Sequence, residues 1–267
     1  MKVLTLAADS RQKPLSVKRL QYIIRFLRLS MMMPIRSTQK ILAFDTSTPR
    51  GSVAVLEGRD VRAELRVDSP RTHSAHLLKS IDFLLERLEW KLGDLNLVAV
   101  GIGPGSFTGI RIGVSTALGI SQSLSIPFAG ISGLDALACQ AELRNGRIGA
   151  VLDAHRSQVY YAEYLRKDGR LRRSRKASLV HVSDLETYFA NRHLYIVGDL
   201  ESCGMTGSEK GGSSDWPHPI PVDLFLAASI GRLASARKRI WRTGDFVVSE
   251  PMYIRPPDAL RNKRRKR

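Results

Sequence analysis

The chain has 267 residues, of which 43% are hydrophobic, and this is enough for two modest domains with buried cores. Its formal net charge of +17 would suit a nucleic-acid-binding protein, but the charge is concentrated at the two ends. Residues 1–40 contain nine Lys or Arg and one acid, and residues 255–267 contain seven and one, which leaves +3 for residues 41–254. This distribution argues against a broad basic face on the folded body. It predicts cationic ends that either contact phosphate backbones nonspecifically or are solvated tails.

Cysteine usage and the N-terminal segment indicate the cellular compartment. Cys139 and Cys203 have no paired metal-ligand or redox spacing, which predicts a reduced, cytoplasmic protein without a disulfide framework. The basic amphipathic segment 17–29 is interrupted by charge too often for a membrane span or a signal-peptide core. It suits a membrane surface or an organelle presequence, or it lies upstream of a translation start at residues 31–33. We expect no membrane partner, and residues 1–39 form a basic extension that is either disordered or not translated.

In chain order, the first half predicts a meander of strands followed by alternating helices and strands. The predicted elements are strands at 40–47, 51–56 and 61–67, a helix at 74–90, a strand at 97–100, a helix that ends near 123, a strand at 128–131 and a helix at 134–143.

The second half begins in the same way. Its predicted elements are strands at 148–153, 158–165 and 194–197, a Gly-, Ser- and Pro-rich mobile loop at 204–221, and a helix at 223–241 that completes this unit. Asp45 and Asp153 each end an apolar strand, and this echo predicts an internal duplication. We therefore expect a mixed α/β fold with helices on the sheet faces, divided into subdomains at 40–145 and 146–257 and followed by a basic tail at 258–267.

A glycine-rich turn at 101–113 joins the strand at 97–100 to the following helix. It is not a Walker loop, because Ile110 stands where the lysine is needed, and Ser106 replaces the third glycine of the dinucleotide fingerprint. The helix after it has a small-residue surface, made of Gly109, Gly113, Ser115, Ala117, Gly119 and Ser121. Small residues allow close approach, either by another subunit or by the chain's own sheet.

Four segments together resemble one family. Residues 41–48, 101–113, 153–160 and 250–256 are similar to motifs of the TsaB (YeaZ) family and occur in the same order. The resemblance implies a duplicated, ribonuclease H-like fold of the actin/Hsp70 type, with mixed sheets flanked by helices.

The resemblance also implies a function. Members are noncatalytic scaffold or dimerization subunits of the complex that makes N6-threonylcarbamoyladenosine in tRNA, and they bind and activate a TsaD-type transferase. Further implied partners are a TsaE-type ATPase, tRNA reached indirectly through the complex, and a second copy of the chain when the transferase is absent. The chain would hold no cofactor or metal of its own, while ATP is allowed at the assembled complex. The implied interface lies on the two long helices, where some residues must instead face the sheet: Leu77, Leu78, Ile81, Leu84, Leu85, Ile110, Val114, Ala117 and Leu118.

Two features leave alternatives open. Asp45, Thr46 and Ser47 occupy the place of the superfamily's first phosphate loop, although we favour ordinary turn formation. His73 and His76 are three residues apart rather than the four of the transferase's metal pair, so an exposed pair near a helix start is the favoured interpretation. The rival functions are a metal-dependent nucleotide hydrolase or nuclease that uses the two strand-end aspartates, and a nucleic-acid-binding protein that acts through its tails.

Overall fold

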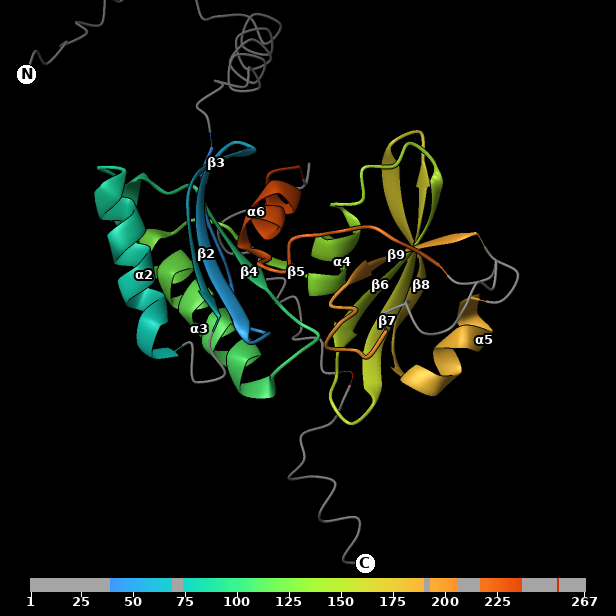
Figure 1. Ribbon diagram of the computed structural model, residues 1–267. Helices are drawn as coiled ribbons and strands as arrows, with labels where there is room; N and C mark the ends of the chain where they lie inside the picture. The colour runs from blue at the N-terminus through green and yellow to red at the C-terminus, as the bar shows by residue number, and fades with distance from the viewer. Residues whose placement is uncertain (1–38, 69–73, 190–192, 206–216, 237–253, 255–267) are drawn as a thin grey trace, which may run out of the picture. The chain divides into compact units, whose positions relative to one another are not determined.

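Two five-stranded sheets form the framework of the chain (Figure 1). The structure is a computed structural model and describes residues 39–68, 74–189, 193–205, 217–236 and 254. Its elements are, in chain order, β1 (Lys40–Asp45), β2 (Arg50–Glu57), β3 (Asp60–Asp68), α2 (Ser74–Arg87), the 3-10 helix η1 (Leu92–Asp94), β4 (Leu97–Gly101), α3 (Phe107–Leu124), β5 (Phe128–Ile131), α4 (Gly133–Ala138), β6 (Gly146–Asp153), β7 (Gln158–Lys167), β8 (Arg170–His181), the 3-10 helix η2 (Val182–Asp184), α5 (Leu185–Phe189), β9 (Leu194–Gly198), β10 (His218–Pro219) and α6 (Ala227–Ala236). Within these ranges, no helix is both long and apolar enough to cross a membrane.

The two sheets share one topology. The first has the strand order β3-β2-β1-β4-β5 and the second has the order β8-β7-β6-β9-β10. In each, three strands form an antiparallel meander, and the first of them pairs in parallel with a later strand, which pairs in parallel with the last. Asp45 ends β1 and Asp153 ends β6, at equivalent places. The predicted duplicated, mixed α/β fold is confirmed.

Strands β1, β2, β4 and β5 of the first sheet are buried on both faces, whereas the edge strand β3 is partly exposed. Helices α2 and α3 cover one face and α6 covers the other (Figure 1). Along β1, Leu42 and Phe44 belong to the core under α2 and α3, whereas Ile41 and Ala43 belong to the core on the opposite face. Because both sets are buried, the strand is an unbroken apolar run rather than an alternating one.

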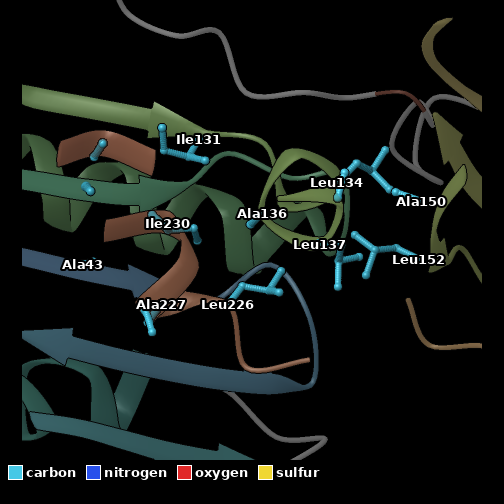
Figure 2. Close-up of a cluster of buried hydrophobic side chains, with 14 of the residues drawn as sticks. Ala43, Ile131, Leu134, Ala136, Leu137, Ala150, Leu152, Leu226, Ala227 and Ile230 are labelled. Atoms are coloured by element: carbon cyan, nitrogen blue, oxygen red, sulfur yellow. The ribbon is translucent and has the colours of Figure 1, made fainter. Parts of the chain in front are cut away.

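A shared core joins the two halves of the chain. Figure 2 shows that side chains from both sheets meet those of α4 and α6 there. The labelled members are Ala43, Ile131, Leu134, Ala136, Leu137, Ala150, Leu152, Leu226, Ala227 and Ile230. On its other face the second sheet is covered by α5, whose Leu185 and Phe189 are buried in a separate core.

The last described helix returns to the first sheet. A Cβ added at Gly231 of α6 would lie 2.4 Å from Cδ1 of Leu56 in β2, and the Ala227 N–H donates a 3.0 Å hydrogen bond to Ser52 Oγ. The prediction that this helix completes the second unit was therefore wrong. Its small face packs directly on β1 and β2, which sequence order does not reveal.

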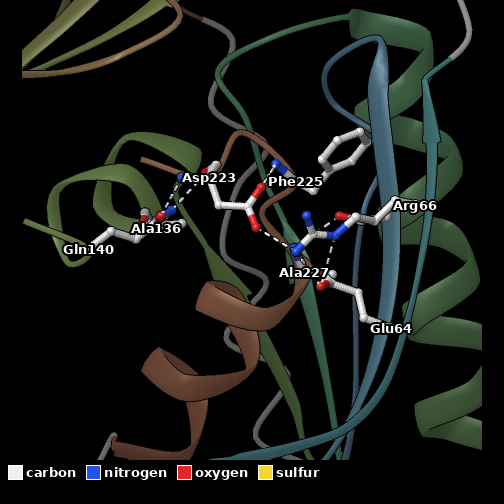
Figure 3. Close-up of polar contacts among 8 residues, drawn as sticks. Glu64, Arg66, Ala136, Gln140, Asp223, Phe225 and Ala227 are labelled. Carbon is white, nitrogen blue, oxygen red and sulfur yellow. Dashed lines mark hydrogen bonds and ion pairs between the residues drawn. The ribbon is translucent and has the colours of Figure 1, made fainter. Parts of the chain in front are cut away.

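A polar network fixes the entry into α6 (Figure 3). The Asp223 N–H donates to Gln140 Oε1 at 2.8 Å, and Gln140 Nε2 donates back to Asp223 O at 2.9 Å. The Asp223 carboxylate accepts from the Phe225 N–H at 3.0 Å and pairs with Arg66 of β3, which also pairs with Glu64 at 2.7 Å. One aspartate thus connects the segment after α4, the segment before α6 and strand β3.

Several predicted bounds change. The helix predicted at 134–143 is α4 and ends at Ala138, and the helix predicted at 74–90 is α2 and ends at Arg87. Strand β8 and helix α5 were not predicted. Parts of four predictions lie outside the described residues: most of the extension at 1–39, most of the loop at 204–221, the helix beyond residue 236, and the tail at 258–267. The boundary between subdomains at residue 145 stays a prediction.

Candidate functional site

The turn after β1 lies in the interior. Asp45, Thr46 and Ser47 are all buried, and Asp45 is 0% exposed. The Ser47 N–H donates to Asp45 Oδ1 at 3.2 Å, as expected of an aspartate that closes its own turn. Thr46 Oγ1 donates to Gly109 O at 2.7 Å, and the Ser106 N–H donates to Ser47 O at 2.7 Å. The turn is therefore bonded to the start of α3.

The glycine-rich motif provides the surface on which this turn packs. Four of its glycines occur at every fourth position of 101–113, and a Cβ at each would collide with the turn. The closest atoms are Asp45 Oδ1 at 2.0 Å from the Cβ of residue 101, Ser47 O at 2.1 Å from that of residue 105, Thr46 O at 1.9 Å from that of residue 109, and Thr46 Oγ1 at 2.5 Å from that of residue 113. Glycine is needed at these positions because backbone and side-chain atoms of the turn occupy the space of a side chain.

The start of α3 is capped by the same motif. Ser106 is the N-cap, and its Oγ accepts a 3.2 Å hydrogen bond from the Gly109 N–H. With Ser106 also bonded to the turn, the first turn of α3 and the end of β1 form one rigid unit. This geometry supports the structural role of Asp45–Ser47. Their interpretation as a vestigial phosphate loop stays a prediction.

The histidine pair is only partly described. His76 is exposed in the first turn of α2, whereas His73 lies outside the described residues. Within the described part of the chain, no group of three or more His, Cys, Asp and Glu side chains is arranged to hold a metal ion.

The nine residues of the predicted interface fall into a buried group and an accessible group. Seven of its nine side chains are buried in the core between the first sheet and its two helices. They are Leu77, Ile81, Leu84, Leu85, Ile110, Val114 and Ala117. These side chains face the sheet and are inaccessible to a partner, so the interface prediction was wrong for these seven residues. Leu78 is 58% exposed and Leu118 is half-buried, so these two remain accessible.

Exposed residues of the two helices form the outer surface of the α2–α3 layer, and Leu78 is the one member that belongs to the predicted interface set. They are Leu78, Asp82, Phe83 and Glu86 on α2, and Arg111, Ser115, Gly119 and Gln122 on α3. Phe83 is 46% exposed and lines an open groove of about 390 Å³ between α2 and β3. A Cβ at Gly119 would meet nothing within 4 Å, in contrast to the four motif glycines. The small residues of α3 thus serve two faces, one packed on the chain's own turn and one open.

Comparisons with known proteins find relatives named for tRNA threonylcarbamoyladenosine biosynthesis. Residues 67–197 match the family model of TsaD, tRNA N6-adenosine threonylcarbamoyltransferase. The chain is 39% identical over 131 residues to the tRNA threonylcarbamoyladenosine biosynthesis protein TsaB of Escherichia coli K12, covering 48% of this chain and 56% of that protein. It is 37% identical over 131 residues to TsaB of Bacillus subtilis 168, covering 49% and 57%. It therefore spans just over half the length of these two relatives.

A third relative is covered further. Over 149 residues the chain is 39% identical to TsaB of Buchnera aphidicola subsp. Schizaphis graminum, covering 55% of this chain and 70% of that protein. Among solved structures, the fold is similar to an uncharacterized Pseudomonas aeruginosa protein with similarity to peptidase YEAZ (TM-score 0.64, 25% identity, 81% of this chain and 100% of that one). It is also similar to YeaZ of Pseudomonas aeruginosa (TM-score 0.57, 25% identity, 73% and 90%). With the motifs and the duplicated sheets, these matches show that the chain belongs to the TsaB (YeaZ) family of tRNA threonylcarbamoyladenosine biosynthesis proteins.

Proposed function

We propose that this chain is a noncatalytic subunit of a tRNA N6-threonylcarbamoyladenosine complex, and that it binds and activates a TsaD-type transferase. Membership of the TsaB family supports this, as does the match of residues 67–197 to the transferase's own family model. Two chains that share a fold present similar surfaces, so the same contact also serves a homodimer when the transferase is absent. In this proposal tRNA and a TsaE-type ATPase belong to the assembled complex, and so does any ATP.

The buried turn supports the noncatalytic part of the proposal. A carboxylate that holds a catalytic metal or a phosphate needs at least one face open to substrate. Asp45 is fully buried, with Gly101 against its carboxylate and its Oδ1 accepting from the Ser47 N–H. This residue therefore works as a structural anchor between β1 and β4 in the proposed subunit.

The outer surface of the α2–α3 layer is the proposed contact with the transferase. The observation on which this rests is the exposure of Leu78, an apolar side chain on a helix whose other leucines face the core. On the neighbouring helix, Ser115 and Gly119 leave room for a partner helix to approach closely. With 14 and 18 residues, α2 and α3 extend about 21 and 27 Å, which is long enough to form an interface of ordinary size.

Co-purification with a TsaD-type subunit tests the proposal. Leu78→Arg and Gly119→Arg each place a long cation on the outer surface, and we expect each to abolish the complex while the free chain stays folded. The melting temperature of the Gly119→Arg chain should be no lower than that of the unmodified chain, because arginine has a higher helix propensity than glycine. Leu165→Arg, at another exposed apolar side chain on β7, is the matched control and should co-purify normally. Val114 is unsuitable for this test because it is only 7% exposed, so arginine there would disrupt the core.

Size-exclusion chromatography of the same variants, with and without the transferase, separates the two oligomers. We expect Leu78→Arg to remove both the homodimer and the heterodimer. If both outer-surface variants still bind the transferase as tightly as the unmodified chain, the contact lies elsewhere and the proposal is refuted.

A further inference from the structure

The positive charge of the folded body is concentrated in one segment. Residues 144–176 contain ten Lys or Arg and three Asp or Glu, a net charge of +7, whereas residues 41–143 and 177–254 each have a net charge of −2. The expectation that the body has no broad basic face stays a prediction, but this segment is strongly basic. The total of +3 for residues 41–254 conceals a strongly basic segment between two weakly acidic ones.

This segment forms the three-stranded meander β6–β7–β8, and β8 is the edge strand of the second sheet. Basic side chains on its inner face are used by the fold. Arg166 Nη2 donates to Ala138 O at 3.2 Å and Cys139 O at 3.1 Å at the end of α4, and Arg173 pairs with Asp135 of α4. These two arginines hold α4 against the sheet and are not available to a partner.

The outer face presents a second set of cations. Arg147 of β6 lies opposite Leu165 of β7, which lies opposite Arg172 of β8, so all three side chains share that face. One step nearer the hairpin end, Lys167 pairs with Arg170 on the same face. We call Arg147, Lys167, Arg170 and Arg172 the basic ribbon. All four are exposed, and within the described part of the chain none of them has an ion-pair partner.

Helix α5 covers only part of this face. Its Phe189 packs on Tyr161 of β7 at 6.2 Å between ring centroids, farther along the strands from the hairpin. Arg175 marks the boundary, because it lies 4.3 Å from the Tyr188 ring of α5 and 3.7 Å from the Glu163 carboxylate. Beyond it no described element covers the sheet, and the side chains of the ribbon are exposed.

The composition of the segment favours a phosphate partner. Eight of its ten cations are arginine, whose planar guanidinium binds phosphate oxygens in pairs. Exposed and unpaired cations gain affinity for a polyanion by releasing its counterions. Leu165 is the one large apolar side chain exposed on this described face, too little to insert into a lipid surface. The face offers no exposed aromatic platform among the described residues, which argues against stacking of single-stranded bases.

We propose that the basic ribbon binds the phosphate backbone of base-paired RNA, and that this chain therefore contacts tRNA directly. The choice of tRNA as the biological ligand rests on the proposed function, whereas the ribbon's affinity for an RNA duplex does not. Contacts of this kind position an RNA without reading its sequence. The ribbon would orient the tRNA that the transferase modifies.

Fluorescence anisotropy with an unmodified tRNA transcript, measured over a range of salt concentrations, tests the proposal on the full chain. The ribbon variant is Lys167→Gln/Arg170→Gln/Arg172→Gln. Each lost phosphate contact should reduce the slope of log K against log salt by about 1, so we expect a reduction of about 3. At 0.1 M salt the Kd should rise roughly ten-fold or more.

The charge-matched control is Arg59→Gln/Arg62→Gln/Lys91→Gln, which removes three exposed cations from the first half of the chain. It should bind tRNA within two-fold of the unmodified chain, and both triple variants should keep the unmodified circular-dichroism spectrum. If the ribbon variant behaves like this control, the basic ends bind the RNA and the proposal is overturned.

Two further probes identify the ligand class. Tighter binding of poly(U) than of tRNA, or a ribbon-dependent affinity for phosphatidylserine vesicles that exceeds that for tRNA, would also overturn the proposal. Co-purification of the ribbon variant with the transferase keeps the two proposals distinguishable. If the ribbon variant still binds the transferase but has lost affinity for tRNA, the proposed role of the ribbon is supported. If only Leu78→Arg loses transferase binding, that result concerns the proposed function and not the ribbon.

Discussion

Gly109→Ala tests the structural role of the glycine-rich motif. The added methyl group would lie 1.9 Å from Thr46 O and 3.1 Å from Thr46 C, and both of these atoms belong to the backbone. Relief of this collision requires α3 or the turn after β1 to move by more than 1 Å, since carbon and oxygen atoms in contact are separated by over about 3 Å. That movement would also break two hydrogen bonds, from Thr46 Oγ1 to Gly109 O and from the Ser106 N–H to Ser47 O.

The expected loss of stability follows from three contributions. Overpacking of this kind costs about 1–3 kcal/mol, and two broken hydrogen bonds cost about 1–3 kcal/mol together. The higher helix propensity of alanine offsets about 1 kcal/mol of this. We expect Gly109→Ala to lower the free energy of unfolding by about 1–5 kcal/mol.

Gly119→Ala is the matched control, because it makes the same chemical change on the same helix. Nothing lies within 4 Å of its added Cβ, so only helix propensity acts, and stability should rise by about 0.5–1 kcal/mol. Urea unfolding followed by far-ultraviolet circular dichroism measures both variants against the unmodified chain. A glycine reserved for a bound phosphate would leave the free chain no less stable when replaced. Equal stability of the two variants would therefore refute the packing role.

Two further predictions concern ionisable groups. Burial raises the pKa of Cys139 to about 11 and that of Cys203 to about 12. In the native chain at pH 8 both thiols should therefore react with iodoacetamide at least about 100-fold more slowly than in urea, and Cys203 should be the slower of the two. Equal rates in the native and unfolded chain, measured by mass spectrometry, would contradict this. Burial opposes the charge of Asp199, but hydrogen bonds from Ser202 and Arg50 outweigh it and hold the pKa of Asp199 below its usual 3.8. The ionised Asp199 therefore stabilises the native chain above pH about 4, and this contribution is lost as the pH falls through the lower pKa of the folded state. Asp199→Asn should lower the free energy of unfolding by about 1–3 kcal/mol at pH 7. In unfolding titrations it should also remove part of the chain's sensitivity to acid.

The interface prediction was wrong for seven of its nine residues because residues with a helical period are mostly those that face the chain's own core. Leu77, Ile81 and Leu84 recur every three or four residues along α2, Leu88 continues the pattern just after it, and all of them contribute to the core beneath it. Leu78 lies at the margin of this stripe and is 58% exposed, whereas Leu85, seven residues later on nearly the same side of the helix, is buried. The helical period alone therefore does not separate the exposed leucine from the buried ones.

Strand β8 was missed because its sequence resembles a solvated run of charge. Of the residues between 170 and 176, five are arginine or lysine and only Leu171 is apolar. The duplication contained the missing signal. The meander of the first half has a third strand at Asp60–Asp68, so an equivalent strand after Lys167 was to be expected.

The contacts of the glycine-rich motif depend on the tertiary structure. The sequence shows that 101–113 is neither of the common nucleotide loops, and it correctly predicts the strand-turn-helix order. It cannot show that Gly101 and Gly109 meet the turn at 45–47 while Gly119 meets open space, because that requires the parallel pairing of β1 with β4. The same limit applies to α6, the last described helix in the chain, which packs on the first two strands, β1 and β2.

The duplication places the two proposed contacts on different sheets, and this has a measurable consequence. Two helices of 14 and 18 residues cover the outer face of the first sheet. The five-residue helix α5 covers part of that of the second, and among the described residues nothing covers its hairpin end. No residue of the outer surface of the α2–α3 layer belongs to the basic ribbon, so their effects should be independent. We expect the chain that combines Leu78→Arg with the ribbon variant to lose as much transferase binding as Leu78→Arg alone. Its loss of tRNA affinity should equal that of the ribbon variant alone. A combined tRNA defect larger than that of the ribbon variant would show that the free chain binds RNA only as a dimer through α2 and α3.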